Sequence, residues 1–233
     1  MLRWIAVAGT LVPAMLFASH ALAEPYFWGF QAEQLEYRTD GDEDIFAWDF
    51  DAFYGSDELR FVWRSEAEYD LDEEEFETLE NQARLQKPIS EFFDGVVGVR
   101  VDTPSGPDRA YGVLGVHGLA PQWFEIDADL FVSNNPLFRF EAEYEALITN
   151  RIALIPRVEV DVPLTDDKDI GAGAWAPKLE LGARLSYDLV DRAVSPYIGV
   201  HYEYLFGETG DLAREEGDER EQVLFVVGTR IMF

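Results

Sequence analysis

The 233-residue sequence contains no cysteine, so a disulfide framework, a thiol nucleophile and a thiolate metal site are all excluded. Histidine and methionine are scarce, at three residues each, which leaves few soft imidazole or thioether ligands for a metal. Basic residues are outnumbered, because 18 Lys and Arg face 46 Asp and Glu, for a formal net charge of −28. A chain this acidic is a poor partner for nucleic acid, whose phosphate backbone is also negative.

Long apolar runs are missing after residue 23. The first 23 residues, MLRWIAVAGTLVPAMLFASHALA, combine a basic Arg3, an apolar stretch and small residues before Ala23, which predicts a secretory signal peptide cleaved after Ala23. The apolar stretch is short and interrupted by Pro13, which argues against a transmembrane anchor. No later segment reaches the ~18 apolar residues of a spanning helix. We expect residues 1–23 to be the signal peptide and residues 24–233 to form one domain.

Alternating apolar and polar residues are what the chain has in abundance. Residues 124–132, FEIDADLFV, place Phe124 and Ile126 on one parity and Glu125, Asp127 and Asp129 on the other, the pattern of a two-faced strand. Similar runs occur at residues 46–54, 59–69, 138–147, 152–162 and 178–189. They are about ten residues long, the length of a tilted strand that crosses a bilayer.

Aromatic residues make up 14% of the chain and gather near the ends of these runs, as in an interfacial girdle. Disordered acidic proteins are poor in aromatics, so the chain is folded. A soluble β-sandwich also alternates, but it seldom sustains runs this long. The pattern therefore favours an all-β protein of the bacterial cell outer membrane, an antiparallel up-and-down transmembrane barrel with a charged lumen.

The spacing of the runs predicts twelve strands. These are residues 26–38, 43–55, 58–70, 73–87, 91–103, 109–120, 122–133, 137–148, 151–162, 177–189, 194–206 and 221–233. Short links alternate with longer polar ones, and short periplasmic turns with long extracellular loops are typical of bacterial barrels. The first, fourth and sixth strands alternate imperfectly, which leaves ten strands as the alternative. We expect residues 163–176 and 207–220 to be extracellular.

The lumen predicted by this parity is crowded with charge. Carboxylates at Glu125, Asp127 and Asp129 would repel one another unless basic groups offset them. Seven arginines share the lumen parity: Arg60, Arg64, Arg100, Arg139, Arg157, Arg184 and Arg230. Two interpretations remain open at this point. The charges either fill and connect a narrow barrel, or line a pathway that favours cations because carboxylates are in excess.

Several motifs carry a family resemblance. GLAPQWFE at residues 118–125, SPYIGV at residues 195–200 and a C-terminal strand that ends on Phe233 resemble the copper resistance protein B family, and the resemblance extends from about Glu33 to Phe233. It implies an outer-membrane barrel that binds or passes copper ions beside a periplasmic multicopper oxidase. Many members carry a Met- and His-rich segment before the barrel. This sequence has none after Ala23, where EPYFWGFQ begins the barrel, so copper binding by such a tail does not carry over.

Copper ligands must then come from the barrel itself. We predict candidate metal ligands at His201 and Glu203, which share one parity of a strand, and at His117 and Glu125. Imidazole with carboxylate suits Cu(II) better than Cu(I), which prefers sulfur. The alternative is that each histidine only hydrogen-bonds to neighbouring charges.

Three further functions remain as alternatives: a general cation-preferring porin, a purely structural small barrel, and an outer-membrane hydrolase. A hydrolase needs a serine beside a histidine. Only Ser186 and Ser195 lie on strands near His201, and no nucleophile motif surrounds either serine. We therefore expect the protein not to be an enzyme.

Overall fold

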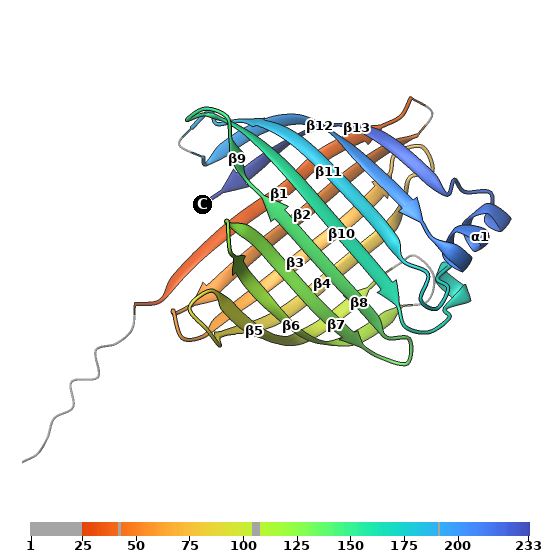
Figure 1. Cartoon of the computed structure of the whole chain (residues 1–233), viewed down its shortest axis with the longest axis horizontal. Helices are drawn as coiled ribbons and strands as arrows, with labels where there is room; N and C mark the ends of the chain where they lie inside the picture. Colours follow the sequence, from red (N-terminus) through yellow and green to blue (C-terminus); the bar gives the residue numbers. More distant parts are fainter. Residues whose placement is uncertain (1–24, 42, 104–107, 191) are drawn as a thin grey trace, which may run out of the picture.

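The computed structural model describes residues 25–41, 43–103, 108–190 and 192–233. The signal peptide predicted at residues 1–23 lies outside the described residues. The strands follow one another around a closed antiparallel barrel, shown in Figure 1. The circle closes where the first strand pairs with the last, from Gln31 with Met232 to Thr39 with Phe225. Within the described part of the chain, no helix has the length and apolar character needed to cross a membrane.

The strands agree with the predicted ones to within about two residues at most ends. They are β1 (Phe27–Thr39), β2 (Asp44–Gly55), β3 (Arg60–Asp70), β4 (Glu75–Pro88), β5 (Phe93–Asp102), β6 (Arg109–Ala120), β7 (Phe124–Val132), β8 (Leu137–Tyr144), β9 (Ala146–Leu147), β10 (Ile152–Pro163), β11 (Lys178–Tyr187), β12 (Val194–Leu205) and β13 (Glu221–Met232). The short β9 follows β8 and pairs with the same neighbour, β10, so both belong to one barrel strand. The described residues thus form a twelve-stranded barrel, which confirms the prediction and rules out ten strands.

The two ends of the barrel differ. The links at residues 56–59, 89–92, 121–123, 148–151 and 188–193 are short, and we call this side the turn end. The opposite side, the loop end, carries residues 164–177 and 206–220 and is where α1 lies in Figure 1. In bacterial outer-membrane barrels the short turns face the periplasm.

One of the predicted polar loops contains a helix. Residues Gly207–Glu216 form α1, and Gly217 ends it with a positive φ of 105°, a conformation that glycine adopts without steric cost. Thr209 Oγ1 donates to the carbonyl of Ala176 at 2.7 Å and accepts from the amide of Gly173 at 3.0 Å. These bonds fasten α1 to the neighbouring long loop, which itself contains the short 3-10 helix η1 (Lys168–Ile170).

The outer face of the barrel is apolar, as the alternation predicted. Mid-strand side chains such as Val97, Leu114 and Val227 are each more than half exposed. Trp28 and Trp123 are exposed near the turn end, where aromatic residues form the interfacial girdle of a membrane barrel. The surface is therefore that of a protein surrounded by lipid, with its polar side chains turned inward.

A β-bulge explains the imperfect alternation of β1. Ala32 pairs with Phe50 and Gln34 pairs with Asp49, so Glu33 is an extra residue on its strand. As a result, two consecutive side chains, Glu33 and Gln34, both line cavities of the lumen.

Candidate functional site

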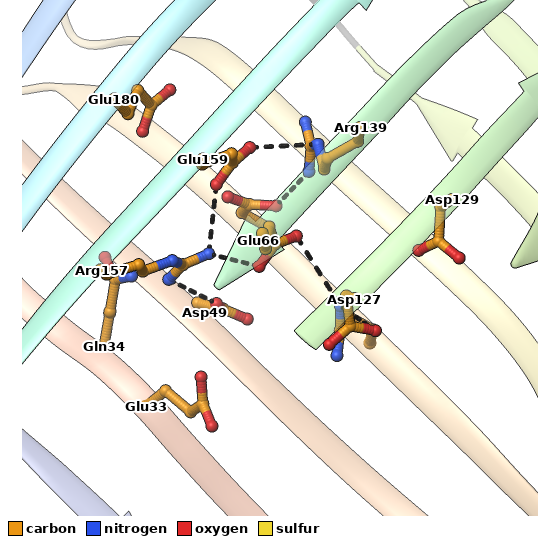
Figure 2. A network of polar contacts seen from close by, with 12 residues as sticks. Glu33, Gln34, Asp49, Glu66, Asp127, Asp129, Arg139, Arg157, Glu159 and Glu180 are labelled. Atoms are coloured by element: carbon orange, nitrogen blue, oxygen red, sulfur yellow. Dashed lines mark hydrogen bonds and ion pairs between the residues drawn. The ribbon is translucent and has the colours of Figure 1, made fainter. Parts of the chain in front are cut away.

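The lumen is filled by ion pairs between side chains of different strands (Figure 2). All seven arginines predicted to face inward have a carboxylate within 4 Å: Arg60, Arg64, Arg100, Arg139, Arg157, Arg184 and Arg230. Arg38 and Arg84 are also buried in the lumen with carboxylate partners, and neither was predicted to lie there from the sequence. The ion pairs therefore link strands across the interior of the barrel, as expected if the charges fill and connect a narrow barrel.

The row of carboxylates on β7 is offset by arginines from distant strands. Arg84, on β4 and completely buried, approaches Asp129 at 2.9 Å and Asp127 at 3.4 Å. Arg64, on β3, lies 3.7 Å from Asp127. The side chains of β3 and β4 reach β7 through the lumen. One strand can therefore carry like charges on its inner side, because arginines of distant strands supply the opposite charge.

His117 and Glu125, two of the four predicted ligands, lie together. His117 on β6 is paired with Asp127 on β7, and its Nδ1 is 3.0 Å from Asp127 Oδ2. Its Nε2 is 3.9 Å from Glu125 Oε1. The exposure of Leu114 on the lipid side agrees with an inward His117. One imidazole and two carboxylates thus meet near the turn end, and Asp127 was not among the predicted ligands.

His201 and Glu203 face inward from β12 but have different partners. The side chain of His201 is almost fully buried, and its Nε2 lies 3.7 Å from Glu180 Oε2. Glu203 is held by Lys178, whose Nζ lies 2.9 Å from Glu203 and 3.0 Å from Glu180. The ammonium group therefore lies between the two carboxylates and competes with any cation that would share them with His201.

Two small cavities lie along the lumen, one above the other. The upper cavity, toward the loop end, has a volume of about 10 Å³ and is lined by Glu180, His201 and Arg157 among others. The lower cavity, toward the turn end, has a volume of about 20 Å³ and includes Glu125, Asp127 and again Arg157. Each has room for roughly one water molecule. His201 lines the upper cavity, and His117 contacts Asp127 and Glu125, which line the lower one.

A third acidic group lies at the loop end. Carboxylate oxygens of Glu43, Asp70 and Glu77 lie within 4.8 Å of one another. Burial raises the pKa of Glu43 above its usual value, although a hydrogen bond from Gln222 opposes this change. Carboxylates alone are ligands for hard cations rather than for copper. The sequence signal was the acid-rich stretches DGDED and DLDEEE at the loop end.

Comparison with known proteins decides the family. Residues 26–233 match the family described as copper resistance protein B precursor (CopB). The chain belongs to the copper resistance protein B family. It is 36% identical to Copper resistance protein B of Escherichia coli over 203 residues, which covers 86% of this chain and 68% of the relative. It is 32% identical over 206 residues to Copper resistance protein B homolog of Pseudomonas syringae pv. tomato (strain ATCC BAA-871 / DC3000), covering 88% and 69%.

Solved structures confirm the barrel fold. The NanC porin aligns with a TM-score of 0.53 at 11% identity, covering 88% of this chain and 99% of the porin. The KdgM porin aligns with a TM-score of 0.50 at 10% identity, covering 88% and 99%. A family member with a closed barrel and an apolar outer face is a protein of the bacterial outer membrane. The family and the porin-like fold point to a non-enzymatic role.

Proposed function

We propose that this member of the copper resistance protein B family binds copper ions in its lumen and passes them across the outer membrane. The observation that carries the proposal is the meeting of His117, Asp127 and Glu125 near the turn end. Imidazole and carboxylate together form a borderline donor set that suits Cu(II). His201 with Glu180 supplies a second, sparser set nearer the loop end.

The surrounding lumen supports this cation role. The lower cavity is lined by six carboxylates, which are Glu33, Asp49, Glu125, Asp127, Glu141 and Glu143, against the two arginines Arg64 and Arg157. Such an excess of negative charge raises the local concentration of cations and disfavours anions. Selectivity for copper must then come from the histidine, because carboxylates alone do not distinguish copper from harder ions.

Binding of Cu²⁺ to the purified, refolded barrel tests the proposal. We expect His117→Ala to weaken Cu²⁺ binding strongly and His201→Ala to weaken it less, while both variants remain folded and inserted in liposomes. Binding should also weaken as the pH falls through the histidine range, because a protonated imidazole cannot coordinate a metal. Unchanged Cu²⁺ binding in the His117→Ala, His201→Ala double variant would show that neither histidine is a copper ligand.

A general porin is the competing function, and cavity size argues against it. Cavities with room for about one water molecule do not pass sugars. Liposomes separate the two functions: copper flux without leakage of a disaccharide supports the proposal, and equal leakage of both supports a porin. We further propose that the barrel lies in outer-membrane lipid and works beside a periplasmic multicopper oxidase. A strain that lacks this gene should then tolerate less copper than the parent strain.

A further inference from the structure

Arg157 is shared by the two cavities of the lumen. It lines both of them, and Gln34, His201 and Glu180 lie on one side while Glu33, Glu125 and Asp127 lie on the other. Its side chain is buried to nine-tenths, and Figure 2 shows it between neighbouring carboxylates. A cation that moves from the upper cavity to the lower one must therefore pass this guanidinium.

Three carboxylates hold the guanidinium in place. Arg157 Nη1 donates to Asp49 at 3.1 Å, and Nη2 donates to Glu141 at 2.9 Å and to Glu159 at 3.2 Å. Asp49 and Glu141 line the lower cavity and Glu159 lines the upper one. The side chain is thus anchored on both sides of the boundary that it forms.

The bond to Asp49 crosses the barrel. Arg157 is on β10 and Asp49 is on β2, and four strands, β11, β12, β13 and β1, lie between them along the shorter way around the sheet. The two side chains therefore meet in the interior rather than along the wall. An arginine stays charged at any physiological pH, so Arg157 is a permanent positive charge at the boundary between the two cavities.

We propose that Arg157 is the gate of the cation path through this barrel, closed by its bond to Asp49 across the lumen. The proposal rests on the proposed passage of cations. A divalent cation that enters either cavity competes with the guanidinium for the same carboxylates and repels it. When Asp49 and Glu141 turn to the ion, Arg157 is released toward its own strand, and the two cavities become continuous.

Arg64 offers a matched control. It is also a buried lumen arginine, and it contacts Asp51 at 3.0 Å, Asp127 at 3.7 Å and Glu141 at 4.0 Å. It lines only the lower cavity. Its removal should enlarge one cavity without joining the two, and it takes one positive charge from the lumen, as removal of Arg157 also does.

Single-channel conductance in planar bilayers with KCl is the test. We expect low conductance for the full mature chain, a severalfold higher and cation-selective conductance for Arg157→Ala, and a value near that of the unaltered protein for Arg64→Ala. Asp49→Asn keeps Arg157 but weakens its bond across the lumen, so it should also raise conductance. An equal rise of conductance in Arg64→Ala overturns the gate. An unchanged conductance in Arg157→Ala, or in Asp49→Asn, also overturns it.

A chemical rescue controls for misfolding. Because the sequence contains no cysteine, Arg157→Cys introduces a unique thiol. A methanethiosulfonate reagent that carries an ammonium group should lower the conductance of this variant again, while a neutral reagent of similar size should lower it less. Equal block by both reagents indicates steric plugging and contradicts a charge gate.

These measurements use K⁺ and do not depend on copper. If Arg157→Ala opens the barrel but the unaltered protein binds no Cu²⁺, the proposed copper function fails and the gate stands. If Cu²⁺ binds at His117 but Arg157→Ala leaves the K⁺ conductance unchanged, the gate fails and the copper function stands.

Discussion

Arg184 on β11 and Glu36 on β1 form a two-bond ion pair inside the barrel, with Nε to Oε2 at 2.9 Å and Nη2 to Oε1 at 2.7 Å. Two strands, β12 and β13, separate them along the wall. Tyr197 on β12 donates to the same carboxylate at 2.7 Å, and the side chain of Glu36 is completely buried. The pair and Tyr197 therefore tie together three strands, β11, β12 and β1, around the seam where β13 meets β1 and the barrel closes.

Removal of one partner of this pair should be strongly destabilising. We expect Arg184→Met to lower the free energy of unfolding by about 3 to 5 kcal/mol, because it leaves a buried carboxylate short of positive charge. The matched control is Arg192→Met, since Arg192 pairs with Glu145 at an exposed position and should cost no more than about 1 kcal/mol. Urea unfolding in lipid vesicles measures both, and equal losses would contradict a special role for the buried pair.

The lipid-facing side should tolerate charge according to depth. Val97 lies at the middle of β5 and is 52% exposed, so Val97→Arg should cost about 2 to 4 kcal/mol at the bilayer midplane. Val132 ends β7 and is exposed to a similar degree, at 47%, so Val132→Arg should cost only about 0 to 1 kcal/mol near the interface. The same unfolding assay compares them. A larger loss for Val132→Arg would mean that the membrane lies at another height on the barrel.

Acid should loosen the long loop at residues 164–177. Burial alone would raise the pKa of Asp167, but hydrogen bonds from Arg109 and Asn135 outweigh it and hold this pKa below the usual 3.8. A depressed pKa in the folded state contributes stability above pH 3.8, and this contribution is lost as the pH falls below that value. Pepsin cleavage of the loop should therefore increase in this acidic range. Asp167→Asn should be cleaved readily throughout the range, and an unchanged pH profile in this variant would refute the assignment.

Lys178 should limit copper binding at the upper site. Its ammonium group lies within 3.0 Å of both Glu180 and Glu203, so Lys178→Gln frees two carboxylates next to His201. On the proposed function, this variant should bind Cu²⁺ more tightly than the unaltered protein, and the added His201→Ala change should abolish the gain. Titration calorimetry measures the difference. Weaker binding in Lys178→Gln would show that Lys178 supports the site rather than competing with it.

The strands were predictable because the lipid and the lumen impose opposite requirements on alternate residues. An exposed Leu181 and an inward Arg184, on β11, follow from that alternation alone. The helix α1 could also have been predicted. The sequence DLAREEG contains good helix formers followed by glycine, which is a signal for the C-terminal end of a helix. The polar composition of this segment led to the prediction of a loop instead.

The partners that the lumen side chains find on other strands were not predictable. Alternation places Glu203 on the same face as His201, but it cannot show that Lys178 on the neighbouring strand lies closer to that carboxylate than any imidazole. Similarly, the bond of Arg157 to Asp49 depends on strand tilt and on how the circle closes, and neither is encoded in a two-residue period. Contacts along one strand follow from sequence, whereas contacts across the barrel follow from its curvature.

The bulge at Glu33 has a consequence for changes in chain length. A single-residue deletion in a strand normally inverts every side chain beyond it, turning a lipid face into a lumen face. Within β1, Glu33 is the extra residue, so its deletion restores simple alternation and leaves Gln34, Glu36 and Arg38 directed inward. In this strand, deletion of Glu33 should keep the lipid-facing and lumen-facing side chains on their own sides. Deletion of Leu35 should instead turn Glu36 and Arg38, which are buried in the lumen, toward the lipid or force the strand to shift its register.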